Sequence, residues 1–114
     1  MSRADAISSA RLKGAAPLFA ALGDATRLGL LVSLCAGGPL TVTRLSGQFE
    51  VSRQAITKHL EVLSEAGLVR SLRQGRERIW TFEPKRLEDA HQYLDRLSKE
   101  WDVALGRLKA FVEN

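Results

Sequence analysis

Apolar residues recur at intervals of three and four along most of the chain, which predicts a mainly helical protein. Pro17 is typical of the first position of a helix, and we expect that helix to end at Leu22, before Gly23. Residues 1–16 are rich in Ala and Ser and are predicted to be a flexible or marginally helical arm. Residues 17–114 are then the folded domain.

A second helix is predicted to begin after Asp24, a residue type that often caps helices, and to end at residues 37–39 (Gly-Gly-Pro). We expect it to be mostly buried. Its apolar positions at helical spacing are Leu28, Leu31 and Cys35, with Leu30 and Leu34 beside them.

Two further helices follow in close succession. Thr41 is predicted to cap a short helix that carries Val42 and Leu45, and Ser52 to cap a helix from Arg53 to Ala66. The second of these has apolar residues at helical spacing, and Gly67 suits the position after its end. A short helix, a tight turn and a second helix form a helix-turn-helix pattern.

Two strand-like runs, residues 68–73 and 77–82, flank a turn that contains Gly75, so they are predicted to form a β-hairpin. Pro84 then opens a last helix that runs nearly to the C-terminus. Its apolar residues are spaced 3-4-3-4-3-4-3: Leu87, Ala90, Leu94, Leu97, Trp101, Ala104, Leu108 and Phe111. This heptad seam is longer than so small a core can cover, so we expect a second copy of the chain to cover it.

Length and composition agree with one globular domain. The chain has 114 residues, 45% of them hydrophobic, and a single cysteine, which excludes an intrachain disulfide. No apolar run is long enough for a membrane span and the N-terminus does not resemble a signal peptide, so we expect a cytoplasmic protein without a membrane partner. No nucleophile–base pair or phosphate-binding glycine loop is present, so we expect no enzyme activity and no cofactor.

The net charge of +4 is unevenly distributed. Residues 44–86 hold nine Lys and Arg against five Asp and Glu, a net charge of +4, whereas residues 87–114 carry −2. Residues 70–78 alone carry a net charge of +3. Positive charge gathered on a helix-turn-helix and a hairpin favours double-stranded DNA as the partner.

The polar face of the helix after Ser52 suits a major groove. Ile56 and Leu60 must face the core, which leaves Arg53, Gln54, Thr57 and Lys58 outward. Arg pairs with guanine, Gln with adenine, Thr with a thymine methyl or a phosphate, and Lys with phosphate. A solvated face of an amphipathic helix is the alternative interpretation of the same pattern.

A helix-turn-helix followed by a basic hairpin is the winged-helix layout. The runs 23–28 (GDATRL), 51–63, 66–69 (AGLV) and 75–76 resemble, in this order, the ArsR-type bacterial transcriptional regulators. The resemblance covers residues 17–112 and implies a homodimeric repressor bound to a two-fold symmetric operator. It implies a DNA-binding set of Ser52, Arg53, Gln54, Thr57, Lys58 and His59, with Arg73, Arg76 and Arg78 on the wing, and a dimer interface of Phe19, Leu94, Leu97, Trp101 and Leu108.

Two sensing sites of that family are incomplete in this chain. Residues 42–46 contain no cysteine, which removes the metal motif of the third helix. Asp89 and His91 match only the first half of a metal site on the last helix, so they are weak candidates and we predict no metal effector. Cys35 lacks the second thiol of the family's dithiol sensors and is expected to be buried.

Two alternatives to an effector-free repressor stay open. The long helix and basic hairpin suit a protein–protein interaction module that docks an acidic partner. A metal- or thiol-responsive repressor could also use the same scaffold, and an unidentified effector or partner protein would be consistent with the sequence.

Overall fold

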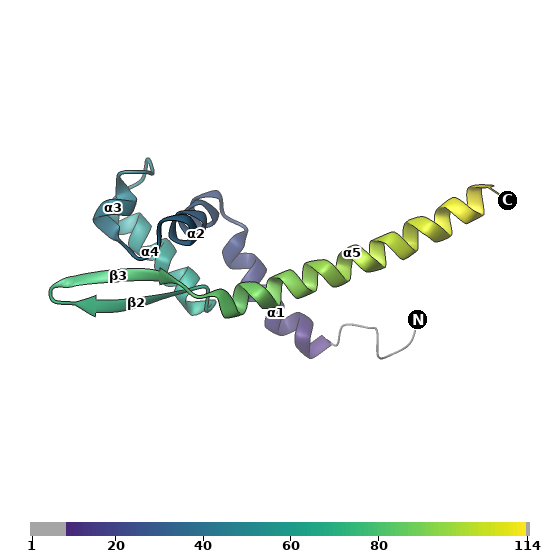
Figure 1. Ribbon diagram of the computed structural model, residues 1–114, viewed down its shortest axis with the longest axis horizontal. Coiled ribbons are helices and arrows are strands. Elements are labelled where there is room, and N and C mark those ends of the chain that lie inside the picture. The colour runs from purple at the N-terminus through teal and green to yellow at the C-terminus, as the bar shows by residue number, and fades with distance from the viewer. Residues whose placement is uncertain (1–8, 114) are drawn as a thin grey trace.

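A computed structural model describes residues 9–113, which form a mainly helical fold with a small antiparallel sheet, as predicted. The sheet lies at one end, and one long helix runs away from it (Figure 1). The elements in chain order are α1 (Ser9–Leu22), α2 (Ala25–Gly37), β1 (Leu40–Thr41), α3 (Val42–Ser46), α4 (Arg53–Glu65), β2 (Val69–Gln74), β3 (Glu77–Phe82) and α5 (Pro84–Glu113).

Three helices begin at the predicted capping residues. The backbone N–H of Arg27 donates to Asp24 Oδ2 at 3.0 Å. Equivalent bonds reach Thr41 Oγ1 at 3.3 Å and Ser52 Oγ at 3.1 Å, each from the residue three positions later. Each cap satisfies a backbone donor that has no partner within its own helix.

The hairpin β2–β3 is extended by a third strand that the sequence did not predict. The strand order is β1-β3-β2, all antiparallel, and Leu40 lies opposite Trp80. β1 has only two residues, which is too short for apolar and polar positions to alternate visibly. Because β1 pairs with β3 and directly precedes α3, it holds the start of α3 next to the hairpin.

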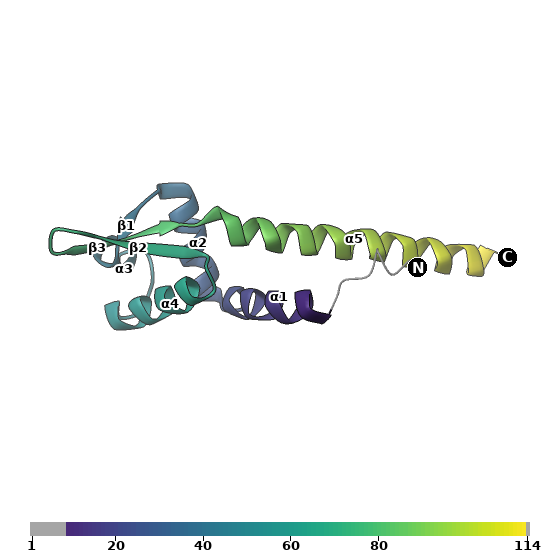
Figure 2. The same ribbon diagram turned by 90° about the horizontal axis from the view of Figure 1, so that it is seen from below.

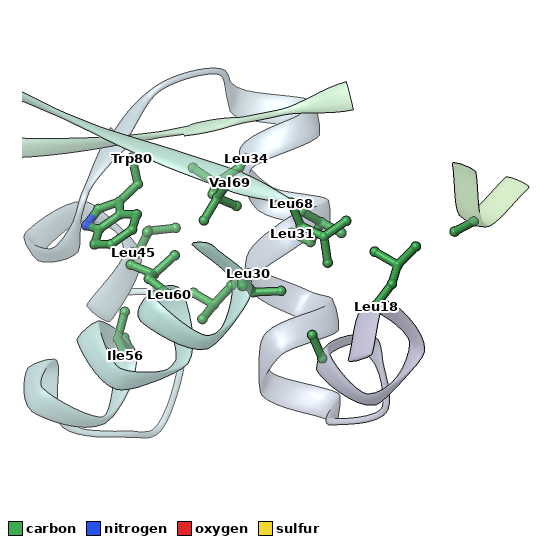
Figure 3. Packing of buried hydrophobic residues seen from close by; sticks show 13 residues of the cluster. Leu18, Leu30, Leu31, Leu34, Leu45, Ile56, Leu60, Leu68, Val69 and Trp80 are labelled. Atoms are coloured by element: carbon green, nitrogen blue, oxygen red, sulfur yellow. The ribbon is translucent and has the colours of Figure 1, made fainter. Parts of the chain in front are cut away.

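The core lies between the sheet and helices α2, α3 and α4. Trp80 of β3 is fully buried and points toward α3 and α4, while Leu45, Ile56 and Leu60 point up toward it (Figure 3). Leu30 and further leucines of α2 fill the other side. Because Ile56 and Leu60 are committed to this core, the opposite side of α4 faces outward.

The predicted buried face of α2 was wrong in part. Leu30, Leu31 and Leu34 are buried, but Leu28 is 48% exposed and Cys35 is exposed. Apolar residues surround most of this helix, so periodicity alone selects no single face. Packing against α4 and β3 selects the side that carries Leu30 and Leu34.

The predicted start of the first helix was also wrong. Pro17 lies inside α1, which begins at Ser9, so residues 9–16 of the predicted arm are helical and its first eight residues lie outside the described part of the chain. Ala15 and Leu18, on either side of Pro17, are both buried. Tertiary packing of this kind can hold a helix through a proline that local preference would place at its start.

The last helix gives the molecule its elongated shape. α5 has 30 residues and is therefore about 45 Å long. The radius of gyration is 18.5 Å, against about 13 Å for a compact domain of this size. α1 lies alongside the first half of α5, and the second half extends beyond the rest of the domain (Figures 1 and 2).

In residues 9–113, no single helix is long and apolar enough to cross a membrane. Only Lys13–Leu22 and Ala25–Gly37 taken together have that length and composition, and they are bent by 89° at the break between them.

Candidate nucleic-acid interface

The helix α4 presents its first two turns as a polar surface. Ser52, Arg53, Gln54 and Lys58 are exposed and Thr57 is half-buried. The hydroxyl Oγ1 of Thr57 donates to the backbone carbonyl of Arg53 at 3.0 Å. The N-terminus of a helix carries partial positive charge, so this surface combines a site that suits an anion with exposed polar side chains.

His59 lies at the border of this polar surface. It is half-buried, and its Nδ1 lies 3.3 Å from Arg27 Nη1 and 3.9 Å from Asp24 Oδ2. The pKa of Asp24 is lowered, first because its carboxylate accepts the backbone N–H of Arg27, and also because Arg27 and His59 lie nearby. His59 thus contacts the start of α2 as well as belonging to the DNA-facing set predicted from the sequence.

The wing ends in a two-residue turn, Gly75-Arg76, between the paired residues Gln74 and Glu77. Gly75 has a φ of 64°, and no described residue other than glycine has a positive φ, so the left-handed angle falls on the first turn position. This pattern is the II′ turn that matches the twist of a hairpin. The turn projects Arg76 at the tip of the wing.

Arg73 and Arg78 lie directly opposite each other across the hairpin. Like charges in that arrangement oppose folding, so an anion between them would be favoured. Arg78 also has internal contacts, with Glu61 of α4 at 3.8 Å and with the ring of Trp80, whose centroid lies 4.4 Å from its guanidinium carbon. Both arginines are exposed, and Arg78 also joins the wing to α4.

Sequence reasoning missed two arginines near this surface. Arg44 is exposed on α3 and lines an open groove together with Thr43, Glu77 and Ile79. Arg27 contacts His59 from the start of α2. Only one sign in the sequence indicated that Arg27 matters to this surface, namely that it lies in the run 23–28, which carries the family resemblance.

Asp89 and His91, the weak candidates for metal ligands, each contact a different side chain. Asp89 Oδ2 accepts from Arg86 Nη1 at 3.1 Å, and His91 Nδ1 lies 4.0 Å from Glu88 Oε1. Among residues 9–113, no three His, Cys, Asp or Glu side chains are grouped so that they could hold a metal ion. Desolvation raises the pKa of the Cys35 thiol, which lowers the fraction of reactive thiolate at neutral pH.

Four of the five residues predicted for the dimer interface lie on α5, and all four are exposed. Leu94, Leu97, Trp101 and Leu108 are between 53% and 62% exposed. Phe19 differs, because it packs edge-on against Tyr93 with a centroid distance of 6.4 Å and is half-buried. The helix α4 and the second half of α5 lie toward opposite ends of the molecule (Figure 2).

A capped helix-turn-helix, a hairpin carrying arginines and a polar outward face on the second helix define a winged helix-turn-helix DNA-binding protein. A family model described as a helix-turn-helix domain matches residues 22–71. An uncharacterized HTH-type transcriptional regulator of Bacillus subtilis, YuzN, is 42% identical over 78 residues, which are 63% of this chain and 85% of that protein.

Further relatives name the family. The arsenical resistance operon repressor of Escherichia coli is 31% identical over 97 residues, covering 85% of this chain and 80% of the repressor. The solved structure of an ArsR-like transcriptional regulator from Rhodococcus sp. RHA1 is 36% identical with a TM-score of 0.73, covering 88% of this chain and 93% of that one. The chain belongs to the ArsR family of DNA-binding transcription regulators.

Proposed function

We propose that the protein is a homodimeric repressor that binds a palindromic operator through α4 and the wing. The observation that carries this proposal is that one chain exposes two different surfaces, which lie on different elements. A basic, polar surface faces outward at α4 and the hairpin, and an apolar seam is exposed on α5. The first suits DNA, and the second suits another copy of the same seam.

Each side chain of the DNA-facing set has a proposed role. Arg53 and Gln54 read base edges, because both are exposed at the start of α4 and both side-chain types can form two hydrogen bonds to a purine. Ser52, Thr57, Lys58 and His59 contact the backbone or a thymine methyl. Arg73 and Arg76 on the wing contact flanking phosphates or the minor groove, and Arg78 supports the wing by its contact with Glu61 of α4.

The dimer sets the form of the operator. Two copies related by a two-fold axis present two α4 helices, so the operator is a palindrome whose half-site centres lie about 10 bp, or a multiple, apart. We propose that a second chain covers Leu94, Leu97, Trp101 and Leu108, and that Phe19 joins this interface through α1. We also propose a cytoplasmic location, because a regulator of transcription acts on DNA.

The proposal includes no metal effector. Asp89 is engaged by Arg86, and the side chain of His91 lies near Glu88 rather than in a ligand set. Equilibrium zinc titration of the wild type and of His91→Ala tests this part. Stoichiometric zinc binding that the substitution removes would replace the proposal with a metal-responsive repressor.

The central experiment is selection of bound sites from a random double-stranded DNA library, followed by gel-shift with excess sheared genomic DNA as competitor. Enrichment of a two-fold symmetric sequence that resists the competitor supports the proposal. If no sequence is enriched and the competitor removes all binding, the chain is better described as a protein–protein interaction module that uses α5 and the basic hairpin.

A further inference from the structure

Arg27 holds the end of α1. Its Nε donates to the carbonyl of Ala21 at 2.7 Å, and its Nη2 donates to the carbonyl of Ala20 at 3.4 Å. Both carbonyls belong to the last turn of α1, where backbone acceptors have no partner within the helix. The guanidinium also places positive charge at the negative end of the helix dipole.

The same guanidinium reaches α4. Arg27 Nη1 lies 3.3 Å from His59 Nδ1. Arginine can only donate, so this contact is a hydrogen bond in the tautomer of His59 whose Nδ1 is an acceptor. One side chain therefore joins the DNA-facing helix to the end of α1.

Asp24 completes the connection at the start of α2. Its carboxylate caps α2 through the backbone N–H of Arg27 and lies 3.9 Å from His59 Nδ1. The turn between α1 and α2 is short, because only Gly23 and Asp24 separate the two helices. The end of α1, the start of α2 and the middle of α4 thus meet around Arg27.

We propose that Arg27 is a positioning residue for DNA binding, which holds α4 at a fixed orientation relative to α1 by way of His59. This inference rests on the proposed function, because α1 and α5 form the half of the molecule that carries the proposed dimer interface. In a dimer, the orientation of α4 relative to that half sets how the two DNA-facing helices are spaced. Arg27 then contributes to the choice of half-site spacing without contacting DNA.

The test is a double-mutant cycle on DNA affinity with Arg27→Gln, His59→Ala and the double variant. Each single substitution is expected to weaken operator binding about tenfold, the effect of losing one hydrogen bond to a charged group. The double variant is expected to bind about as well as the weaker single variant, because both substitutions break one connection. The proposal would be overturned if the fold-losses of operator affinity in the two single variants multiplied in the double variant.

Arg86→Gln is the matched control. Arg86 also donates to a carbonyl of α1, that of Gly14 at 3.1 Å, but its other polar partner is Asp89 of α5. Both substitutions remove one positive charge, so their shared electrostatic effect on DNA affinity cancels in the comparison. Arg86→Gln is expected to leave the affinity within a fewfold of the wild type and to show no coupling to His59→Ala.

Operators with altered half-site spacing distinguish a positioning role of Arg27 from a role in stability alone. Operators with one base pair inserted or deleted between the half-sites are compared with the selected operator, alongside thermal unfolding of each variant. Arg27→Gln is expected to discriminate less between spacings, and Arg27→Lys to restore thermal stability but not discrimination, because lysine is a point charge. Unchanged discrimination in Arg27→Gln would refute the inference, whereas a wild type that selects no operator would refute the proposed function instead.

Discussion

Truncating Trp101 should separate the two chains of the proposed dimer. The indole is 61% exposed in the single chain. A tryptophan presents up to about 250 Å², so roughly 150 Å² is available to a partner. At about 25 cal/mol per Å² this is an upper bound of about 4 kcal/mol per chain. Truncation of a buried interface aromatic commonly costs about 2 kcal/mol or more, and two-fold symmetry doubles it to roughly 4 kcal/mol per dimer.

The expected result for Trp101→Ala is a dimer dissociation constant raised about a thousandfold, since each 1.4 kcal/mol is a factor of ten. Sedimentation equilibrium over a concentration series measures it. Val103→Ala is the matched control, because Val103 is 51% exposed on the same helix but lies off the heptad seam. Equal dissociation constants for the two variants would refute the placement of the interface, as would a Leu97→Glu/Trp101→Glu variant that still sediments as a dimer.

Three other outcomes follow from the structure. Gln54→Ala should lose about 1–3 kcal/mol of discrimination at one base across an operator panel, whereas Arg76→Ala should weaken all operators alike; similar profiles in the panel would contradict these roles. If about eight phosphates are neutralised, the slope of log affinity against log salt concentration should be near −7. Gel-shifts at several salt concentrations measure this slope, and an affinity that does not change with salt would contradict the prediction. Leu60→Ala should cost about 2–5 kcal/mol of unfolding free energy in urea melts, because Leu60 is fully buried, and Leu72→Ala at a 57% exposed site should cost far less.

The parts of the fold that local chemistry determines could be predicted from the sequence. Asp24, Thr41 and Ser52 cap helices as expected, because a short polar side chain before an apolar periodic run has few other roles. The hairpin and its turn at Gly75 followed from the same kind of reasoning. The parts that depend on contacts distant in sequence were missed or misplaced: the two-residue β1 forms only because β3 lies beside it, and α1 continues through Pro17 because it packs on α5.

The buried face of α2 shows a different limit. Six of the eight residues from Leu28 to Cys35 are apolar, which leaves no polar stripe to mark the solvent side, so Cys35 was assigned to the core although it is exposed. The heptad seam of α5 was predictable for the opposite reason: its polar positions are numerous and regularly placed, so the apolar stripe is well defined. Periodicity predicts a face only where both kinds of residue are present.

Counting charges along the chain has a related limit at the candidate DNA interface. The four arginines of residues 70–78 contribute equally to the net charge, yet the structure gives them different surroundings. Arg70 pairs with Glu83 at 3.2 Å, and Arg78 lies between Glu61 and the ring of Trp80. Each of these ion pairs must loosen before its arginine can neutralise a phosphate, so we expect Arg70 and Arg78 to contribute less to the salt dependence than Arg73 and Arg76. The charge that the wing offers to DNA is therefore concentrated at its tip, where its reach is greatest.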